Sequence, residues 1–82
     1  MEKSIYSEEY SLLISQLKKA REEKSLTQSE LAERLGQTQS FVSKVERGER
    51  RLDVVELRAF CQSIGITFLT FIDTFDRSLA NG

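Results

Sequence analysis

Apolar residues recur at intervals of three and four positions over most of this 82-residue chain, which predicts amphipathic helices. The first stripe predicts a helix from about Glu8 to Lys24. Its members are Tyr6, Tyr10, Leu13, Ile14, Leu17 and Ala20. Arg21 falls on the same stripe, four residues after Leu17. Because a guanidinium that faces a core needs a partner or a route to water, Arg21 is expected to be paired or to extend outward.

Two short helices are predicted next, with a tight turn at Gly36 between them. Residues 27–30 read T-Q-S-E, the form of a capping box, so Thr27 is the expected N-cap of a helix at about 28–35. Its apolar face consists of Leu31, Ala32 and Leu35. Gly36 follows, where a left-handed residue ends many helices.

The next helix is expected at about 39–47, with Thr38 as its N-cap and Gly48 as its stop. Val42 and Val45 point to one side of this helix. The opposite side carries Gln39, Ser40, Ser43, Lys44 and Arg47. One short helix therefore buries two valines and exposes a face that is polar at its start and basic at its end.

Two further apolar stretches complete the pattern. Asp53 is the expected N-cap of a helix that runs to Ile64, with a core stripe of Leu57, Phe60, Cys61 and Ile64. A single cysteine on such a stripe is interpreted as a small buried hydrophobe in preference to a redox group. The segment 67–76 is short and strongly apolar, with Phe68, Leu69, Phe71, Ile72 and Phe75. Residues 1–7 are expected to be a flexible segment, 8–76 the domain and 77–82 a frayed tail.

Composition narrows the possible functions. The length allows one domain, and the absence of proline allows helix over most of it. With no histidine and one cysteine, the chain lacks the usual zinc ligands, an internal disulfide and the commonest general base. Neither an enzyme nor a metal or cofactor site is therefore expected. The apolar runs are too short for a membrane span and the N-terminus lacks a secretory pattern, so a cytoplasmic protein is expected.

Charge is distributed unevenly along the sequence. The net charge is −1, yet residues 34–51 hold five basic and two acidic side chains. That segment is therefore positive and the remainder negative. Phosphate binding depends on a local basic patch and not on the net charge of the chain. A basic stretch of sequence can, however, also be a solvated helix face with no binding role.

Two short helices around a tight turn, with the second polar on its outer face, follow the plan of a helix-turn-helix. The major groove of B-DNA admits one helix, and its base edges can be distinguished by hydrogen bonds. Gln39 and Ser40 lie at the start of the outer helix, and a glutamine can bond adenine through N6 and N7. Lys44 can reach guanine or phosphate, and Gln28 begins a helix whose free N–H groups attract phosphate.

Residues 26–36 read L-T-Q-S-E-L-A-E-R-L-G and residues 39–48 read Q-S-F-V-S-K-V-E-R-G. These segments closely resemble the XRE family of helix-turn-helix domains, also called Cro-type or lambda-repressor-like, and the resemblance covers about residues 10–75. The resemblance implies an all-α, compact five-helix bundle with a central helix-turn-helix. It also implies that the third helix enters the major groove of double-stranded DNA.

The resemblance assigns roles residue by residue. Base contacts are expected from Gln39, Ser40 and Lys44, with Ser43 a lesser candidate. Backbone contacts are expected from Gln28, Thr38, Arg47, Arg50 and Arg51. Arg21 is expected to pair with Glu46 as a structural ion pair. Phe41 departs from the small residue common at its position, and packing toward the fourth helix is favoured over contact with a DNA sugar.

The C-terminal aromatic residues raise the question of assembly. They either close the core of the monomer or form a twofold interface, as the last helix of related proteins often does. We expect a homodimer through Phe68, Leu69, Phe71, Ile72 and Phe75, because these side chains cover a wide arc of one short helix. Twofold symmetry would place the two recognition helices about 34 Å apart on a palindromic operator.

The sequence therefore predicts a nucleoid-associated transcriptional regulator, favoured as a repressor of bacterial or phage character. Phage repressors, restriction–modification controllers and antitoxins share these features, and the sequence does not separate them. The alternative is a protein-interaction module, such as an antitoxin, that keeps the fold but binds little DNA. Acidic residues on the outer face of the third helix would favour that alternative, and Gln39, Ser40, Ser43 and Lys44 include none.

Overall fold

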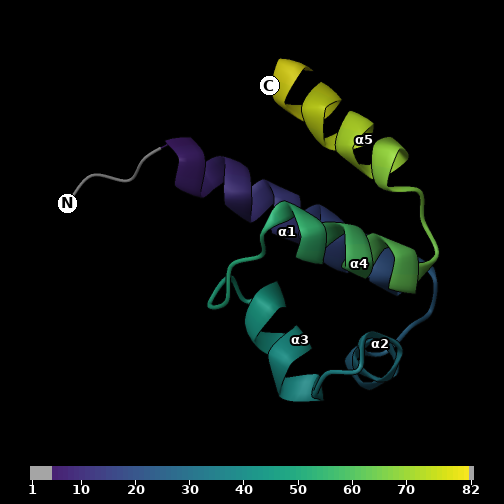
Figure 1. Cartoon of the computed structure of the whole chain (residues 1–82). Helices are drawn as coiled ribbons and strands as arrows, with labels where there is room; N and C mark the ends of the chain where they lie inside the picture. The colour runs from purple at the N-terminus through teal and green to yellow at the C-terminus, as the bar shows by residue number, and fades with distance from the viewer. Residues whose placement is uncertain (1–4, 82) are drawn as a thin grey trace.

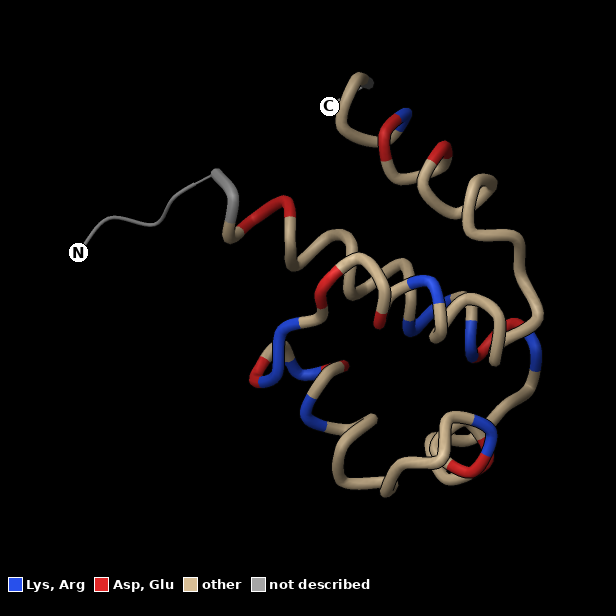
Figure 2. The backbone as a smooth tube through the Cα atoms, viewed as in Figure 1, with Lys and Arg blue, Asp and Glu red and all other residues tan. Residues whose placement is uncertain are grey.

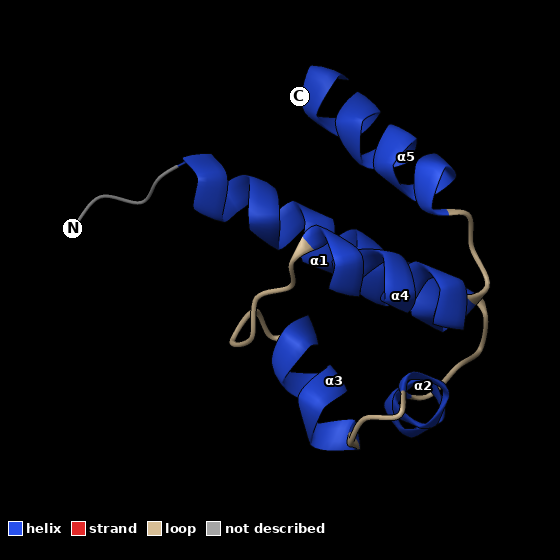
Figure 3. Ribbon diagram, in the orientation of Figure 1, coloured by secondary structure: helices blue, strands red, loops and turns tan. Residues whose placement is uncertain are grey.

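The computed structural model describes residues 5–81, with side chains from residue 7 to residue 80. Within this range the chain forms five helices and no strand (Figure 3). They are α1 (Ile5–Glu23), α2 (Gln28–Leu35), α3 (Gln39–Glu46), α4 (Val54–Ile64) and α5 (Phe68–Asn81). The predicted all-α five-helix bundle is confirmed.

The helices form three groups (Figure 1). α1 and α4 occupy the middle, the α2–α3 pair lies on one side and α5 on the other. α3 packs against α1, α2 packs against α4, and α5 contacts both central helices. The α2–α3 unit is thus supported from behind, and its outer surface is left free.

Local capping explains the inner helix boundaries. Thr27 Oγ1 accepts a hydrogen bond from Glu30 N at 3.0 Å, and Thr27 N donates to Glu30 Oε1 at 2.8 Å. Gly36 ends α2 with φ of 71°, in the left-handed region that glycine tolerates. Asp53 and Glu56 form a second capping box at the start of α4. Capping and glycine positions therefore fix these helices locally.

Both terminal helices are longer than the sequence analysis predicts. α1 already begins at Ile5, and no glycine or proline interrupts residues 5–8. α5 continues through residues 77–81, which were expected to fray. The hydrogen bond from Gln16 Nε2 to Ser78 Oγ, at 2.8 Å, ties this last part of α5 to α1. Residues 1–4, residue 82 and the Tyr6 side chain, for which predictions were made, lie outside the described part.

The core lies where the apolar stripes meet. Its buried members are Ile14, Leu17, Leu31, Ala32, Val42, Val45, Leu57, Phe60, Cys61, Ile64 and Phe71. Cys61 is fully buried, and burial raises the pKa of its thiol to about 11. This environment suits the apolar interpretation of Cys61.

Phe71 requires a correction, because it was predicted at a dimer interface together with its neighbours. Its side chain is only 6% exposed and packs into the core of its own chain. Leu69 is 76% exposed, while Phe68, Ile72 and Phe75 are half-buried. Phe71 lies on the side of α5 that faces α1 and α4, so it is a core residue.

A buried ion pair joins α1 to the end of α3. Arg21 Nε donates to Glu46 Oε2 at 2.7 Å, and Arg21 Nη2 donates to Glu46 Oε1 at 3.0 Å. Arg21 Nη1 also donates to the carbonyl oxygen of Leu26. The two charged side chains are 8% and 3% exposed. Each of the three guanidinium nitrogens of Arg21 therefore donates to a partner.

We expect Arg21→Ala to lower the free energy of unfolding by on the order of 3 kcal/mol, because Glu46 would remain buried without its counter-charge. Thermal melting should show a fall in midpoint of more than about 10 °C for a domain of this size. Arg77→Ala is the control, since Arg77 pairs with Asp73 at 2.9 Å on an open surface. Its midpoint should change little. Equal midpoints for Arg21→Ala and the wild type would refute a stabilising role for the pair.

Candidate nucleic-acid interface

α3 is anchored by its inner face and presents its outer face to solvent. Val42 and Val45 are both completely buried. Thr38 caps the helix, and its Oγ1 accepts a hydrogen bond from Phe41 N at 3.1 Å. Of the predicted base-contact residues, Gln39, Ser40 and Lys44 are exposed and Ser43 is half-buried. The structure thus brings all four to one surface of α3.

The side chain of Gln39 is held by a chain of hydrogen bonds. Gln39 Nε2 donates to Gln28 Oε1 at 2.7 Å, and Gln28 Nε2 donates to Glu46 Oε1 at 2.9 Å. Because Glu46 pairs with Arg21, the first residue of α3 is connected to the buried ion pair. An amide nitrogen has two protons, so Gln39 keeps one donor and its amide oxygen for a further partner.

This chain changes the interpretation of Gln28. The family resemblance implies a contact between Gln28 and a DNA backbone, but both side-chain polar atoms of Gln28 bond other protein groups. Its position opens α2, where the first main-chain N–H groups of a helix point outward. Nothing in the sequence signals the bond between Gln28 and Gln39, which lie 11 positions apart.

The basic residues nearest to α3 lie at its C-terminal end and in the loop that follows, whereas the first part of α3 carries no charge (Figure 2). Arg47 donates to Glu49 at 3.0 and 3.2 Å and to Ser43 Oγ at 2.5 Å. The hydrogen bonds with Glu49 raise the pKa of Arg47 and lower the pKa of Glu49. The charge of Arg47 is therefore largely balanced in the free protein.

Arg50 is also balanced by an acid. It donates to Glu56 Oε2 at 2.7 Å and to Glu56 Oε1 at 3.1 Å. These bonds, with a further one from the backbone of Asp53, lower the pKa of Glu56 to about 2. The guanidinium also lies over the ring of Phe41, 5.2 Å from its centroid. Arg50 is thus held against the protein surface by both charge and stacking.

Phe41 packs as expected. Its ring is half-buried and lies 6.1 Å from the ring of Phe60 in α4, measured between centroids. The preference for packing toward the fourth helix is confirmed.

Arg51, like Arg50, lies over an aromatic ring, but it has no acidic partner among the described residues. Its guanidinium lies 4.1 Å from the centroid of the Tyr10 ring in α1. The Tyr10 hydroxyl accepts a hydrogen bond from Leu52 N at 3.0 Å, which fixes the loop to α1. No acid within residues 5–81 forms an ion pair with exposed Arg51. The apolar stripe identified Tyr10 as a core residue, but gave no signal that it also orders this loop.

The part of the chain that the structure describes holds neither a metal site nor a single membrane-spanning helix. No cluster of three or more histidine, cysteine, aspartate or glutamate side chains there is arranged to hold a metal ion. No single helix there is long and apolar enough to cross a membrane. Only α4 and α5 taken together have that length and apolar composition, and they are bent by 111° relative to each other.

Two short helices joined by a tight turn, with the second exposing a polar face flanked by basic residues, define a helix-turn-helix DNA-binding domain. A family model described as helix-turn-helix matches residues 17–71. The chain belongs to the XRE family of helix-turn-helix transcriptional regulators, which is not a class of enzymes.

Relatives and solved structures agree with this family. An uncharacterised HTH-type transcriptional regulator, y4dJ of Sinorhizobium fredii, is 33% identical over 67 residues, 82% of this chain and 87% of the relative. An XRE-family like protein from Pseudomonas syringae is 43% identical, with a TM-score of 0.87 over 90% of both chains. A point mutant of the restriction–modification controller protein C.Esp1396I is 25% identical, with a TM-score of 0.80 over 98% of this chain and 96% of that one.

Proposed function

We propose that this regulator acts as a sequence-specific repressor that reads the major groove of double-stranded DNA with α3. The proposal rests chiefly on the side chain of Gln39. It is exposed at the first turn of α3, and its hydrogen bond to Gln28 orients it. An amide with one free N–H and a free oxygen matches N7 and N6 of adenine. Ser40, Lys44 and Ser43 lie on the same helix surface and are the further candidates for base contact.

Contacts to the DNA backbone are proposed on both sides of α3. Thr38 and the main-chain N–H groups of α2 that begin at Gln28 lie on one side, where helix N-termini favour phosphate. Arg47, Arg50 and Arg51 lie on the other side. Their contributions are expected to differ, because Arg47 and Arg50 must leave an acidic partner to meet phosphate. Arg51 has no acidic partner among the described residues and is expected to contribute most.

A homodimer is proposed through the exposed side of α5. Leu69 is the most exposed member, and Phe68, Ile72 and Phe75 add half-buried apolar surface beside it. Apolar side chains gathered on one helix of a small domain favour association with a second copy. A twofold dimer would present two α3 helices about 34 Å apart and would match a palindromic operator. Such a regulator would work in the cytoplasm, associated with the nucleoid.

Gln39→Ala tests the base contact. The operator can be selected from a random DNA library, and binding can then be measured with single-base variants of that site. We expect a loss of about 1–3 kcal/mol for the selected operator and a relaxed preference at one position in each half-site. Gln62→Ala is the control, because Gln62 is also an exposed glutamine but lies on α4, outside the α2–α3 unit. Equal weakening of all DNA sequences by Gln39→Ala would contradict the assignment.

The difference between the arginines can be tested with Arg51→Gln and Arg50→Gln. We expect Arg51→Gln to lower affinity for all sequences and to reduce the slope of log affinity against log salt by about 1. Arg50→Gln should reduce that slope less, because Glu56 already balances Arg50. A larger effect from Arg50→Gln would show that the ion pair with Glu56 opens on DNA.

Leu69→Asp tests the dimer by sedimentation equilibrium. The wild type is expected to be dimeric, and a buried carboxylate at position 69 should separate the subunits. Val54→Asp is the matched control, since Val54 is 64% exposed but lies at the start of α4. A monomeric wild type, or a Leu69→Asp dimer as stable as that of Val54→Asp, would refute the interface.

A further inference from the structure

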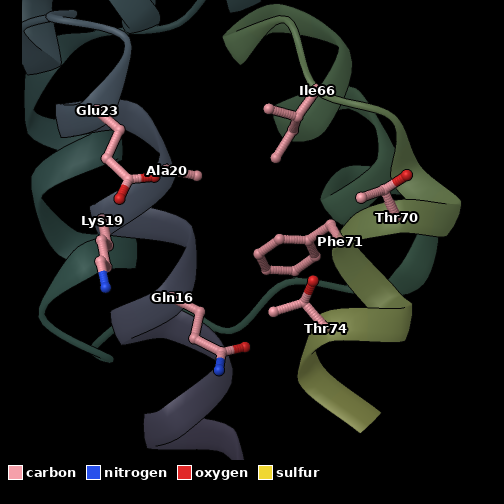
Figure 4. Close-up of a pocket in the computed structure, with 8 residues that line it drawn as sticks. All are labelled: Gln16, Lys19, Ala20, Glu23, Ile66, Thr70, Phe71 and Thr74. Carbon is pink, nitrogen blue, oxygen red and sulfur yellow. The ribbon is translucent and has the colours of Figure 1, made fainter. Parts of the chain in front are cut away.

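A groove separates α5 from α1 on the side of the bundle away from α3. Its volume is about 320 Å³. Ala20 of α1, Ile66 before α5 and Phe71 of α5 supply apolar walls, and Gln16 and Thr74 lie at one end (Figure 4). Sites for small organic ligands have this character, with mostly apolar walls, a few polar groups and volumes from about 300 Å³ upward.

Gln16 is the polar group that gives the groove its chemistry. Its Nε2 donates to Ser78 Oγ at 2.8 Å. Its Oε1 is buried, and no donor among the described residues reaches it. Figure 4 shows this oxygen directed toward α5, with Phe71 and Thr74 opposite. A buried acceptor without a donor is unfavourable, so a molecule that supplies a donor here would relieve that cost.

The charges around the groove indicate which molecules fit. Lys19 and Glu23 lie along its α1 side, one turn apart and of opposite sign. Neither an anion nor a cation is favoured by such a pair. The apolar walls and the single acceptor therefore select for a neutral molecule that carries one hydrogen-bond donor.

We propose that the α1–α5 groove binds a small neutral molecule with an aromatic or branched apolar body and one hydroxyl donor. The apolar body lies against Phe71, Ile66 and Ala20, and the hydroxyl donates to Gln16 Oε1. The final torsion angle of a glutamine is soft, so a small turn of the amide brings the buried oxygen to the ligand. The site is distinct from α3 and does not depend on the proposed DNA contacts.

The position of the groove would couple this ligand to assembly. Thr70 and Thr74, which line it, lie on a different side of α5 from Leu69, so the ligand leaves the proposed dimer face free. A molecule wedged between α1 and α5 sets the angle at which α5 leaves the bundle. That angle would then determine how two copies, and their two α3 helices, are oriented.

Phenol and toluene are a matched pair of probes, equal in shape but different in their donor. Titrations of the full chain can be followed by the backbone amide shifts of α1 and α5 in NMR spectra. A merely apolar groove binds toluene more tightly, because toluene is the more apolar molecule. We expect the reverse, with phenol binding at least about threefold more tightly than toluene.

Three variants identify the acceptor and the groove. Gln16→Met removes the oxygen at similar volume and should restore the preference for toluene. Ser78→Ala removes the partner of Gln16 Nε2 but keeps Oε1, so the preference for phenol should persist. Ala20→Phe fills the groove and should abolish saturable shifts with both probes. Absence of saturable shifts in the wild type, tighter binding of toluene, or an unchanged preference in Gln16→Met would each overturn the proposal.

Discussion

The arrangement of the outer surface of the α2–α3 unit depends on one buried ion pair, between Arg21 and Glu46. Two charges removed from water are tolerated only when their geometry is good and their remaining hydrogen-bonding groups are satisfied. Here the guanidinium bonds both carboxylate oxygens and the carbonyl of Leu26, and Gln28 adds a donor to the carboxylate. The pair therefore joins α1, the start of α2 and the end of α3. Because it requires all three segments in place, it restricts how α3 can sit on the bundle.

The same carboxylate has a second consequence at the surface. Glu46 orients Gln28, and Gln28 orients Gln39. The side chain that we propose to recognise a base edge is thus positioned by other protein groups. Of the arginines at the end of α3 and in the loop that follows, Arg47 and Arg50 are balanced by Glu49 and Glu56, whereas no acid among the described residues pairs with Arg51. A chain with a net charge of −1 can therefore still present local positive charge next to α3.

The sequence predicted the parts of the fold that depend on short-range chemistry. The sequence predicted both ends of α2 and the start of α3 to the exact residue, from Thr27, Gly36 and Thr38. This was possible because helix caps and left-handed glycines act within one helical turn. Long-range contacts could not be predicted in this way. The wide apolar arc of α5 did not reveal that Phe71 faces inward. The last part of α5 is tied to α1 by a bond between Gln16 and Ser78, 62 positions apart, for which the sequence gives no signal. At the site, exposure of the polar face of α3 was predictable, whereas the engagement of Gln28 and the acid partners of the arginines were not.

The attachment of the α3–α4 loop to α1 bears on the thermodynamics of recognition. Tyr10 accepts a hydrogen bond from Leu52 N and carries Arg51 on its ring, so the loop belongs to the folded body. A flexible loop would lose conformational freedom when it met a phosphate, and that loss would oppose binding. In this protein the freedom is lost when the chain folds. The heat-capacity change on DNA binding should then reflect only the surface that the two molecules cover, without a contribution from coupled folding of the loop.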